Sequence, residues 1–271
     1  MTLALVGATA AAAVVGTRWA VDELGAPVCV IAAGGREESL TPEQTANAAT
    51  IAAVSVQRGL PVRSATVALA TAIQESKLRN LTYGDADSQG LFQQRPSQGW
   101  GTEAQVTDPV YAANAFYDAL LEVEGWETGV VTEVAQAVQR SAFPDAYADH
   151  EAEARVLASV LTGQEGASTT MGCDLDDPAQ AGSVDELASK VSAQLGMETT
   201  VDAAGGVVTV LVPDEARAWS AATWAVAHAD AEDVVSVTVG DRAWLRSSGS
   251  VEWTAAEAPA APGTVVVELA R

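Results

Sequence analysis

The spacing of apolar residues changes near Gly163, and this change constrains the fold more than any other feature of the 271-residue chain. Before that point, apolar residues recur at the three- and four-residue intervals of buried helices, as in residues 64–76. After it, β-branched runs such as residues 207–212 and 264–269 alternate with helical segments. The sequence therefore predicts an α+β protein overall, in which an all-α domain is followed by a small α+β domain.

Four segments follow from this pattern. Residues 1–28 are an apolar N-terminal segment, residues 29–163 the helical domain, residues 164–182 a polar, acidic linker, and residues 183–271 an accessory α+β domain. In the helical domain we expect helices over residues 41–58, 64–76, 108–123, 132–140 and 144–161. In the accessory domain we expect helices over residues 183–196 and 215–229, and strands over residues 207–212, 234–239, 243–246, 251–254 and 264–269.

The N-terminus and the two cysteines bear on localisation. Residues 2–16 carry no charge, which suits the core of a signal peptide, although a span continued through residues 19–21 or a buried Ala-rich helix remains open. Cys29 and Cys173 bracket the helical domain, and we expect a disulfide between them, two unrelated buried thiols being the alternative. Since disulfides form in oxidising compartments, we expect an exported protein, extracellular or held at the cell envelope.

Composition excludes several functions. The 36 acidic residues outnumber the 14 basic ones and give a net charge of −22, which repels the phosphates of nucleic acid. Two His and two Cys are too few for a zinc site, so we expect neither metal nor cofactor. Any chemistry is therefore expected from Asp and Glu side chains.

The strongest catalytic candidate is Glu75, which closes a strongly apolar helix and faces residues 77–107, a stretch without apolar periodicity. A carboxyl at the edge of an apolar wall has its charged form disfavoured, so its pKa rises. Such a group can protonate a poor leaving group, for example a glycosidic oxygen. Amide and aromatic side chains that can bind or stack on sugars follow it in the chain: Tyr83, Phe92, Gln93, Gln94 and Trp100.

These residues resemble motifs of the lysozyme-like superfamily, in the branch of soluble lytic transglycosylases and goose-type lysozymes. Glu75-Ser76 is similar to the catalytic Glu-Ser pair of that family, and GLFQ at residues 90–93 is similar to its Gly-Leu-Met-Gln motif. The resemblance covers residues 45–160. The runs GLFQQRPSQGWG and AVQRSAFPDAY also resemble a group of actinobacterial envelope proteins.

The resemblance implies cleavage of glycosidic bonds in peptidoglycan glycan strands, with Glu75 as general acid and base. It also implies that Ser76 and Gln93 orient Glu75 or the substrate. The third motif of the family, Ala-Tyr-Asn, is replaced here by AVQRS at residues 137–141, which makes Gln139 and Ser141 candidate cleft residues. The full set of candidate substrate-binding residues is Ser76, Tyr83, Gly90, Phe92, Gln93, Gln94, Gln139 and Ser141.

The reaction and the role of the second domain stay open. Inverting hydrolysis requires a second carboxylate about 6.5–9.5 Å from the first, whereas lytic transglycosylases resemble one-carboxylate enzymes. Candidates for a second acid are Asp85, Asp87, Asp108 and Asp145. A non-catalytic envelope protein that binds glycan or a partner is the alternative, with the accessory domain as a candidate surface for another envelope protein.

Overall fold

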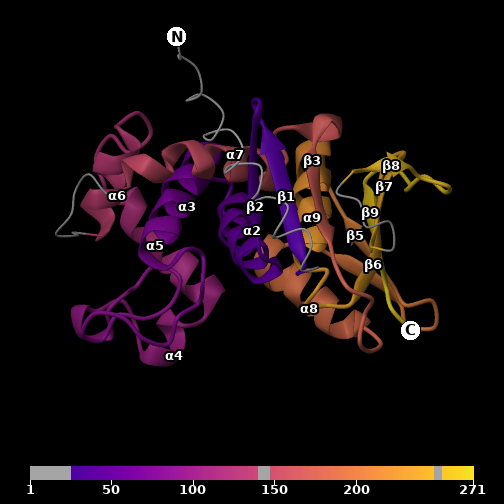
Figure 1. Ribbon diagram of the computed structural model, residues 1–271, viewed down its shortest axis with the longest axis horizontal. Coiled ribbons are helices and arrows are strands. Elements are labelled where there is room, and N and C mark those ends of the chain that lie inside the picture. Colours follow the sequence, from indigo (N-terminus) through magenta and orange to yellow (C-terminus); the bar gives the residue numbers. More distant parts are fainter. Residues whose placement is uncertain (1–25, 140–146, 247–251) are drawn as a thin grey trace, which may run out of the picture.

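Two antiparallel sheets and a group of helices form the fold. The computed structural model describes residues 26–139, 147–246 and 252–271. A three-stranded sheet has the order β2-β1-β3, and a six-stranded sheet has the order β4-β5-β9-β6-β7-β8 (Figure 1). The α+β class predicted from the sequence is confirmed.

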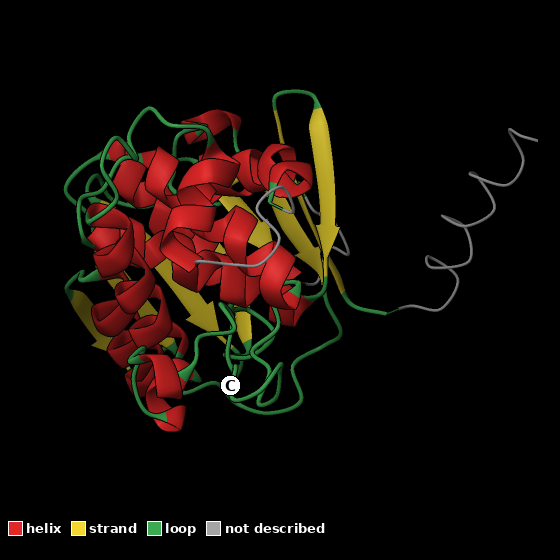
Figure 2. Ribbon diagram, turned by 90° about the vertical axis from the view of Figure 1, so that its left-hand side faces the viewer, coloured by secondary structure: helices red, strands yellow, loops and turns green. Residues whose placement is uncertain are grey.

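The N-terminal part begins with a hairpin and continues with helices. Strands β1 (Val28–Ala33) and β2 (Arg36–Leu40) pair in antiparallel, and α2 (Pro42–Gln57) starts directly after a capping box at Thr41. Viewed from the helical side, the helices lie in front of the strands (Figure 2). The remaining helices of this part are α3 (Val62–Ser76), α4 (Glu103–Val106), α5 (Pro109–Leu121), α6 (Val131–Gln139) and α7 (Glu151–Leu161), with short 3₁₀ turns at Pro96–Gln98, Ala148–His150 and Gly166–Ser168.

Helix α3 is the central element of the N-terminal part. It packs against α2, α5, α6 and α7, and eleven of its fifteen residues are buried. A helix that is buried on nearly every side needs small or apolar residues all round, and its sequence VRSATVALATAIQES supplies them. The last turn of α3 is therefore fixed from several directions, and that turn carries Glu75.

The C-terminal part is a sheet with helices on one face. Its elements are α8 (Val184–Leu195), β4 (Thr199–Asp202), β5 (Val207–Leu211), α9 (Glu215–Ala227), β6 (Val234–Val239), β7 (Arg242–Leu245), β8 (Thr254–Ala255) and β9 (Thr264–Leu269). Strand β3 (Thr170–Asp174), which precedes them in the chain, belongs to the three-stranded sheet. Helices α8 and α9 pack on strands β4, β5, β6 and β9. The β6–β7 hairpin turns at Gly240, which has the positive φ of 53° that a tight turn favours. The predicted strand over residues 251–254 falls partly on residues outside those described.

The prediction that residues 29–163 are all-helical is wrong, because most of β1 and all of β2 lie within them. The expected linker, residues 164–182, also contains β3, which pairs with β1 and packs on α9. Cys29 and Cys173 lie opposite each other in β1 and β3 and form the predicted disulfide. Strand β3 pairs with β1 over a sequence separation of 144, which leaves no local signal. The hairpin of β1 and β2 does have a local signal, the Gly34-Gly35 turn, and this signal was missed.

One hydrophobic core extends through both parts. Buried residues from α2 and α3 belong to the same cluster as those of α8, α9 and the six-stranded sheet. Helix α2 packs directly on α9, so these two helices form the junction between the parts (Figure 1). Among the helices of the described ranges, none has both the length and the apolarity required to cross a bilayer.

Candidate functional site

Glu75 is half-buried in the last turn of α3, where the chain leaves the core. The hydroxyl of Tyr147 donates a hydrogen bond of 2.7 Å to Oε1 of Glu75, and the side chain of Gln139 donates another. Tyr147 is fully buried and Gln139 is the last residue of α6. Two uncharged donors from distant segments therefore hold the carboxyl in place.

The surroundings of Glu75 raise its pKa. Burial is the largest cause, because it disfavours the charged carboxylate. The hydrogen bonds from Tyr147 and Gln139 act in the opposite direction, since they stabilise the charge, but burial outweighs them. The sequence predicted this direction, and the structure confirms it. A carboxyl that keeps its proton to higher pH can serve as a general acid.

Ser76 is buried, and its hydroxyl faces backbone carbonyls of the protein instead of a ligand. Its Oγ lies 2.7 Å from the carbonyl oxygen of Leu91 and 3.0 Å from that of Ala72. The contact ties the end of α3 to the GLFQ segment. The expectation that Ser76 contacts a substrate is therefore wrong for this conformation, because its hydroxyl is used inside the protein.

Gly90 permits a close approach between two stretches of the irregular segment. It has a φ of 77°, and a Cβ at this position would lie 2.0 Å from the carbonyl oxygen of Val106. No other residue type avoids that clash. Nearby, Nδ2 of Asn80 donates to the carbonyl of Thr107 over 2.8 Å and joins the two ends of the segment.

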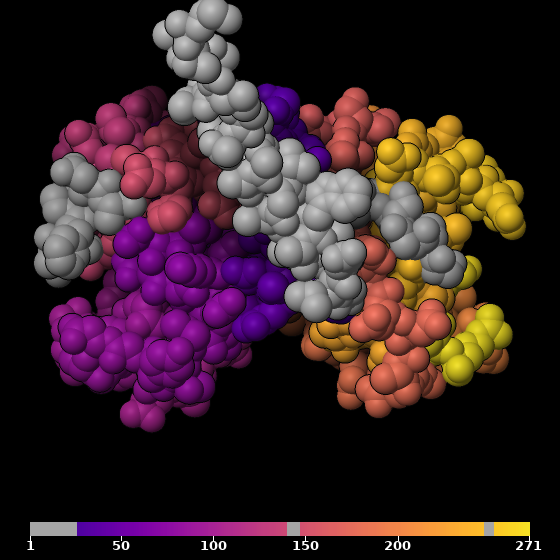
Figure 3. Space-filling view, viewed as in Figure 1, coloured from indigo at the N-terminus to yellow at the C-terminus, as the bar shows by residue number. Residues whose placement is uncertain are grey.

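The segment of residues 77–107 is thus an ordered loop, even though it has little regular structure. Figure 3 shows it as part of the purple lobe at the lower left of the molecule. Gln93 adopts a left-handed φ of 48°, and its Nε2 donates within the loop to the carbonyls of Gly90 and Tyr83. Tyr83 is 70% exposed, so its ring is available to a ligand.

Two predicted substrate-binding residues are core residues instead. Phe92 is fully buried and stacks on Phe116 with 4.7 Å between ring centroids. Gln94 is 1% exposed, and its Nε2 donates to the carbonyl of Ala112 in α5. The predictions of sugar contact for Phe92 and Gln94 are wrong in this conformation, because a loop residue can point inward as readily as outward.

A surface hollow adjoins Gln139. Its volume is about 400 Å³, and Trp100 and Gln139 lie in its lining together with Gln98, Gly99, Ala119 and Val138. Nε2 of Gln139 donates to the carbonyl of Phe92 over 2.7 Å, so this one amide links the hollow, the GLFQ segment and Glu75. Ser141 lies outside the described residues.

Two of the candidate second acids have structural partners. Asp87 accepts hydrogen bonds from the backbone and hydroxyl of Ser97 and pairs with Arg95 at 2.9 Å, which together lower its pKa to about 2. Asp108 caps α5 by accepting from the backbone of Val110 and Tyr111. Asp85 is exposed, and Asp145 lies outside the described residues.

Sequence reasoning missed Tyr147 as a site residue. It stands at the end of the AFPDAY run, directly before the turn that leads into α7. A tyrosine that precedes a helix has many structural roles, and only the fold brings it to Glu75, 72 residues earlier in the chain.

Comparison of the chain with models of known protein families and with curated protein sequences finds no match. Within the described ranges, no three His, Cys, Asp or Glu side chains are grouped so that they could hold a metal ion. Glu75, with its raised pKa and its hydrogen bonds from Tyr147 and Gln139, is therefore the main indication of function.

Proposed function

We propose that this protein is an exported glycosidase with a lysozyme-like N-terminal part, and that it cleaves glycosidic bonds of peptidoglycan with Glu75 as general acid and base. The observation that carries the proposal is the half-buried Glu75, whose pKa is raised and whose carboxyl is held by Tyr147 and Gln139. The Glu-Ser and GLFQ motifs that resemble lytic transglycosylases support it. In this structure the two motifs are joined by the bond between Ser76 and the carbonyl of Leu91.

The chemistry would begin with proton transfer. Protonated Glu75 donates its proton to the glycosidic oxygen as the bond to the sugar breaks, and the carboxylate then accepts a proton from the attacking group. Tyr147 and Gln139 have donor groups that stabilise the carboxylate produced in the first half of the reaction. Trp100 lies with Gln139 in the lining of the hollow and offers a ring for a sugar face, and the exposed Tyr83 offers another on the same loop.

A reaction with a single carboxylate is the version that we favour. Asp87 and Asp108 already have structural partners, and attack by the acetamido group of the substrate itself requires no second acid. The acetamido oxygen bonds to C1 as the glycosidic bond breaks and the leaving oxygen takes the proton of Glu75. The C6 hydroxyl of the same sugar then attacks C1, displaces the acetamido oxygen and gives its proton to the Glu75 carboxylate, so the predicted product is an anhydro-sugar end. Export is supported by the disulfide, since such bonds persist in oxidising compartments.

A non-catalytic protein that binds glycan strands or another envelope protein is the second candidate. The net charge of −22 favours binding to another envelope protein, because an anionic wall repels an acidic protein. In this version the C-terminal part, with helices on one face of its sheet, provides the surface for an envelope partner.

Digestion of purified peptidoglycan distinguishes the two candidates. The native protein is compared with Glu75→Gln and with the control Glu122→Gln, which makes the same change at an exposed position at the end of α5. We expect anhydro-muropeptides in the mass spectrum from the native protein and the control, and none from Glu75→Gln. Reducing ends that depend on Glu75 would indicate hydrolysis instead. Sedimentation of the protein with intact wall, without released products, would refute catalysis and favour the binding role.

A further inference from the structure

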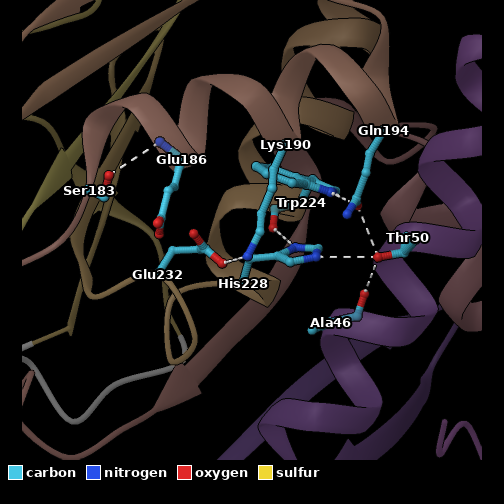
Figure 4. A network of polar contacts seen from close by, with 9 residues as sticks. All are labelled: Ala46, Thr50, Ser183, Glu186, Lys190, Gln194, Trp224, His228 and Glu232. Atoms are coloured by element: carbon cyan, nitrogen blue, oxygen red, sulfur yellow. Dashed lines mark hydrogen bonds and ion pairs between the residues drawn. The ribbon is translucent and has the colours of Figure 1, made fainter. Parts of the chain in front are cut away.

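His228 is buried at the junction of the two parts of the chain. It caps the C-terminus of α9, is 6% exposed, and stacks on Trp224 with 4.3 Å between ring centroids. Figure 4 shows the ring between α9 and Thr50, a residue of α2 in the N-terminal part. The histidine therefore belongs to the contact that holds the C-terminal part on α2.

The hydrogen bonds of the ring show which nitrogen carries the proton when the imidazole is neutral. Nδ1 lies 2.8 Å from the carbonyl oxygen of Trp224, and since a carbonyl only accepts, Nδ1 carries the proton. In neutral histidine Nε2 then has a lone pair, which faces the hydroxyl of Thr50 at 3.3 Å. The amide oxygen of Gln194 on α8 accepts from Nε1 of Trp224 and lies 2.9 Å from the same hydroxyl. One polar network thus joins α2, α8 and α9.

The charged groups around this network come from α8 and from the segments next to His228. Lys190 on α8 pairs with Glu232, and Glu186 lies one turn before it on the same helix (Figure 4). Arg246, which follows β7, donates to the carbonyl of Ala229 and pairs with Asp230 at 3.5 Å. Helix α2 faces the ring with the neutral hydroxyl of Thr50.

These surroundings disfavour a proton on Nε2. Burial lowers the pKa of His228 from 6.5 to about 4, the positive charge of Lys190 adds to this effect, and the hydrogen bond to the carbonyl of Trp224 opposes it. Since the ring is desolvated by α2 on one side and by its own helix on the other, separation of the two parts would return it to water.

We propose that His228 is an acid-sensitive latch between the two parts of the protein, strong while its imidazole is neutral and weakened when that ring takes up a proton. The inference is independent of glycosidase activity. It identifies the contact between α2 and α8–α9 as the place where acid weakens the fold, and it assigns the sensing group to one side chain.

The sign and size of the effect follow from linkage. The unfolded chain takes up a proton at His228 near pH 6.5, whereas the folded chain takes it up only near pH 4. Between these values the unfolded state binds more protons, so stability falls as the pH falls. Over this range the folding equilibrium constant decreases by a factor of about 300 through this residue alone, and below pH 4 the factor no longer grows.

The test measures denaturant unfolding of the full chain between pH 7 and pH 4 for the native protein, for His228→Gln and for the control His150→Gln. Glutamine keeps an N–H for the carbonyl of Trp224 but takes up no proton. The Asp and Glu side chains are the same in all three proteins, and of these only Glu153, 3.9 Å from His150, loses a neighbour in the control. We expect the native protein and the control to lose about 300-fold more in folding equilibrium constant than His228→Gln. Equal losses in all three proteins would overturn the proposal.

Two further readouts localise the effect. The chain has two histidines, so the ring protons of His228 can be assigned by comparison with the two variants, and their titration by NMR should have a midpoint near pH 4. A midpoint near 6.5 would overturn the proposal. Hydrogen exchange, corrected for intrinsic rates, should accelerate in acid in α2 and α9 before it does in α3. Uniform acceleration across the three helices would contradict a latch at this contact.

Discussion

Replacement of Ser76 by alanine should weaken the fold through a single orphaned carbonyl. The hydroxyl has one proton, and the carbonyl of Leu91 is its nearer acceptor at 2.7 Å, against 3.0 Å for Ala72. The Ala72 oxygen has another donor, the backbone of Leu78, and so does not depend on the hydroxyl. Leu91 is fully buried, so its carbonyl would lose its partner away from water. We expect Ser76→Ala to lower the free energy of unfolding by about 1–3 kcal/mol.

Thr71→Val on the same helix is the matched control. Thr71 is also fully buried and its hydroxyl donates to the carbonyl of Val67, but that carbonyl already accepts the helical N–H four residues on. Its loss should therefore cost less than about 1 kcal/mol. Urea unfolding at pH 7, with linear extrapolation, measures both. Equal losses in the two variants would refute the argument that Ser76 supports the GLFQ segment.

Three further predictions concern the loop, the site and the disulfide. Gly99 has a similar φ of 85° but open space around it, so Gly99→Ala should lower the unfolding free energy by about 1–2 kcal/mol. Gly90→Ala should lower it clearly more, and thermal or urea unfolding measures both variants. Tyr147→Phe removes a hydrogen bond that lowers the pKa of Glu75, so this pKa should rise. Because a general acid acts while protonated, the alkaline limb of the pH–rate profile for peptidoglycan cleavage should move to higher pH. An unmoved limb would exclude Glu75 as that acid. Replacing both cysteines by serine should remove about 5 kcal/mol from the unfolding free energy, since the bond closes a loop with a sequence separation of 144.

Local signals in the sequence predicted most helices well. The capping residue Thr41 and the Asp-Pro pair at residues 108–109 mark helix starts that the structure reproduces. The gap in apolar periodicity over residues 77–107 likewise corresponds to the long loop. Such features are encoded within a few residues, so a single sequence is enough to read them.

Features that depend on distant partners were not predictable in this way. Strand β3 pairs with the distant β1, and Tyr147 becomes a site residue only because α3 brings Glu75 to it. Phe92 and Gln94 show the complementary error, since loop composition indicates exposure but tertiary packing decides it. The raised pKa of Glu75 was predictable, because an apolar helix ending in a carboxyl is a local pattern, whereas its catalytic role stays a prediction.

The disulfide between β1 and β3 also turns most of the N-terminal part into a covalent ring. All of the helices from α2 to α7, and the long exposed loop between α3 and α5, lie inside this ring. A protease that cuts the ring once yields two fragments that stay joined, and loop tips are where such cuts concentrate. Under oxidising conditions a nicked molecule would therefore migrate as one species in a denaturing gel and separate only on reduction. A protein built in this way can survive a cut in the loop that carries its candidate site without losing either half.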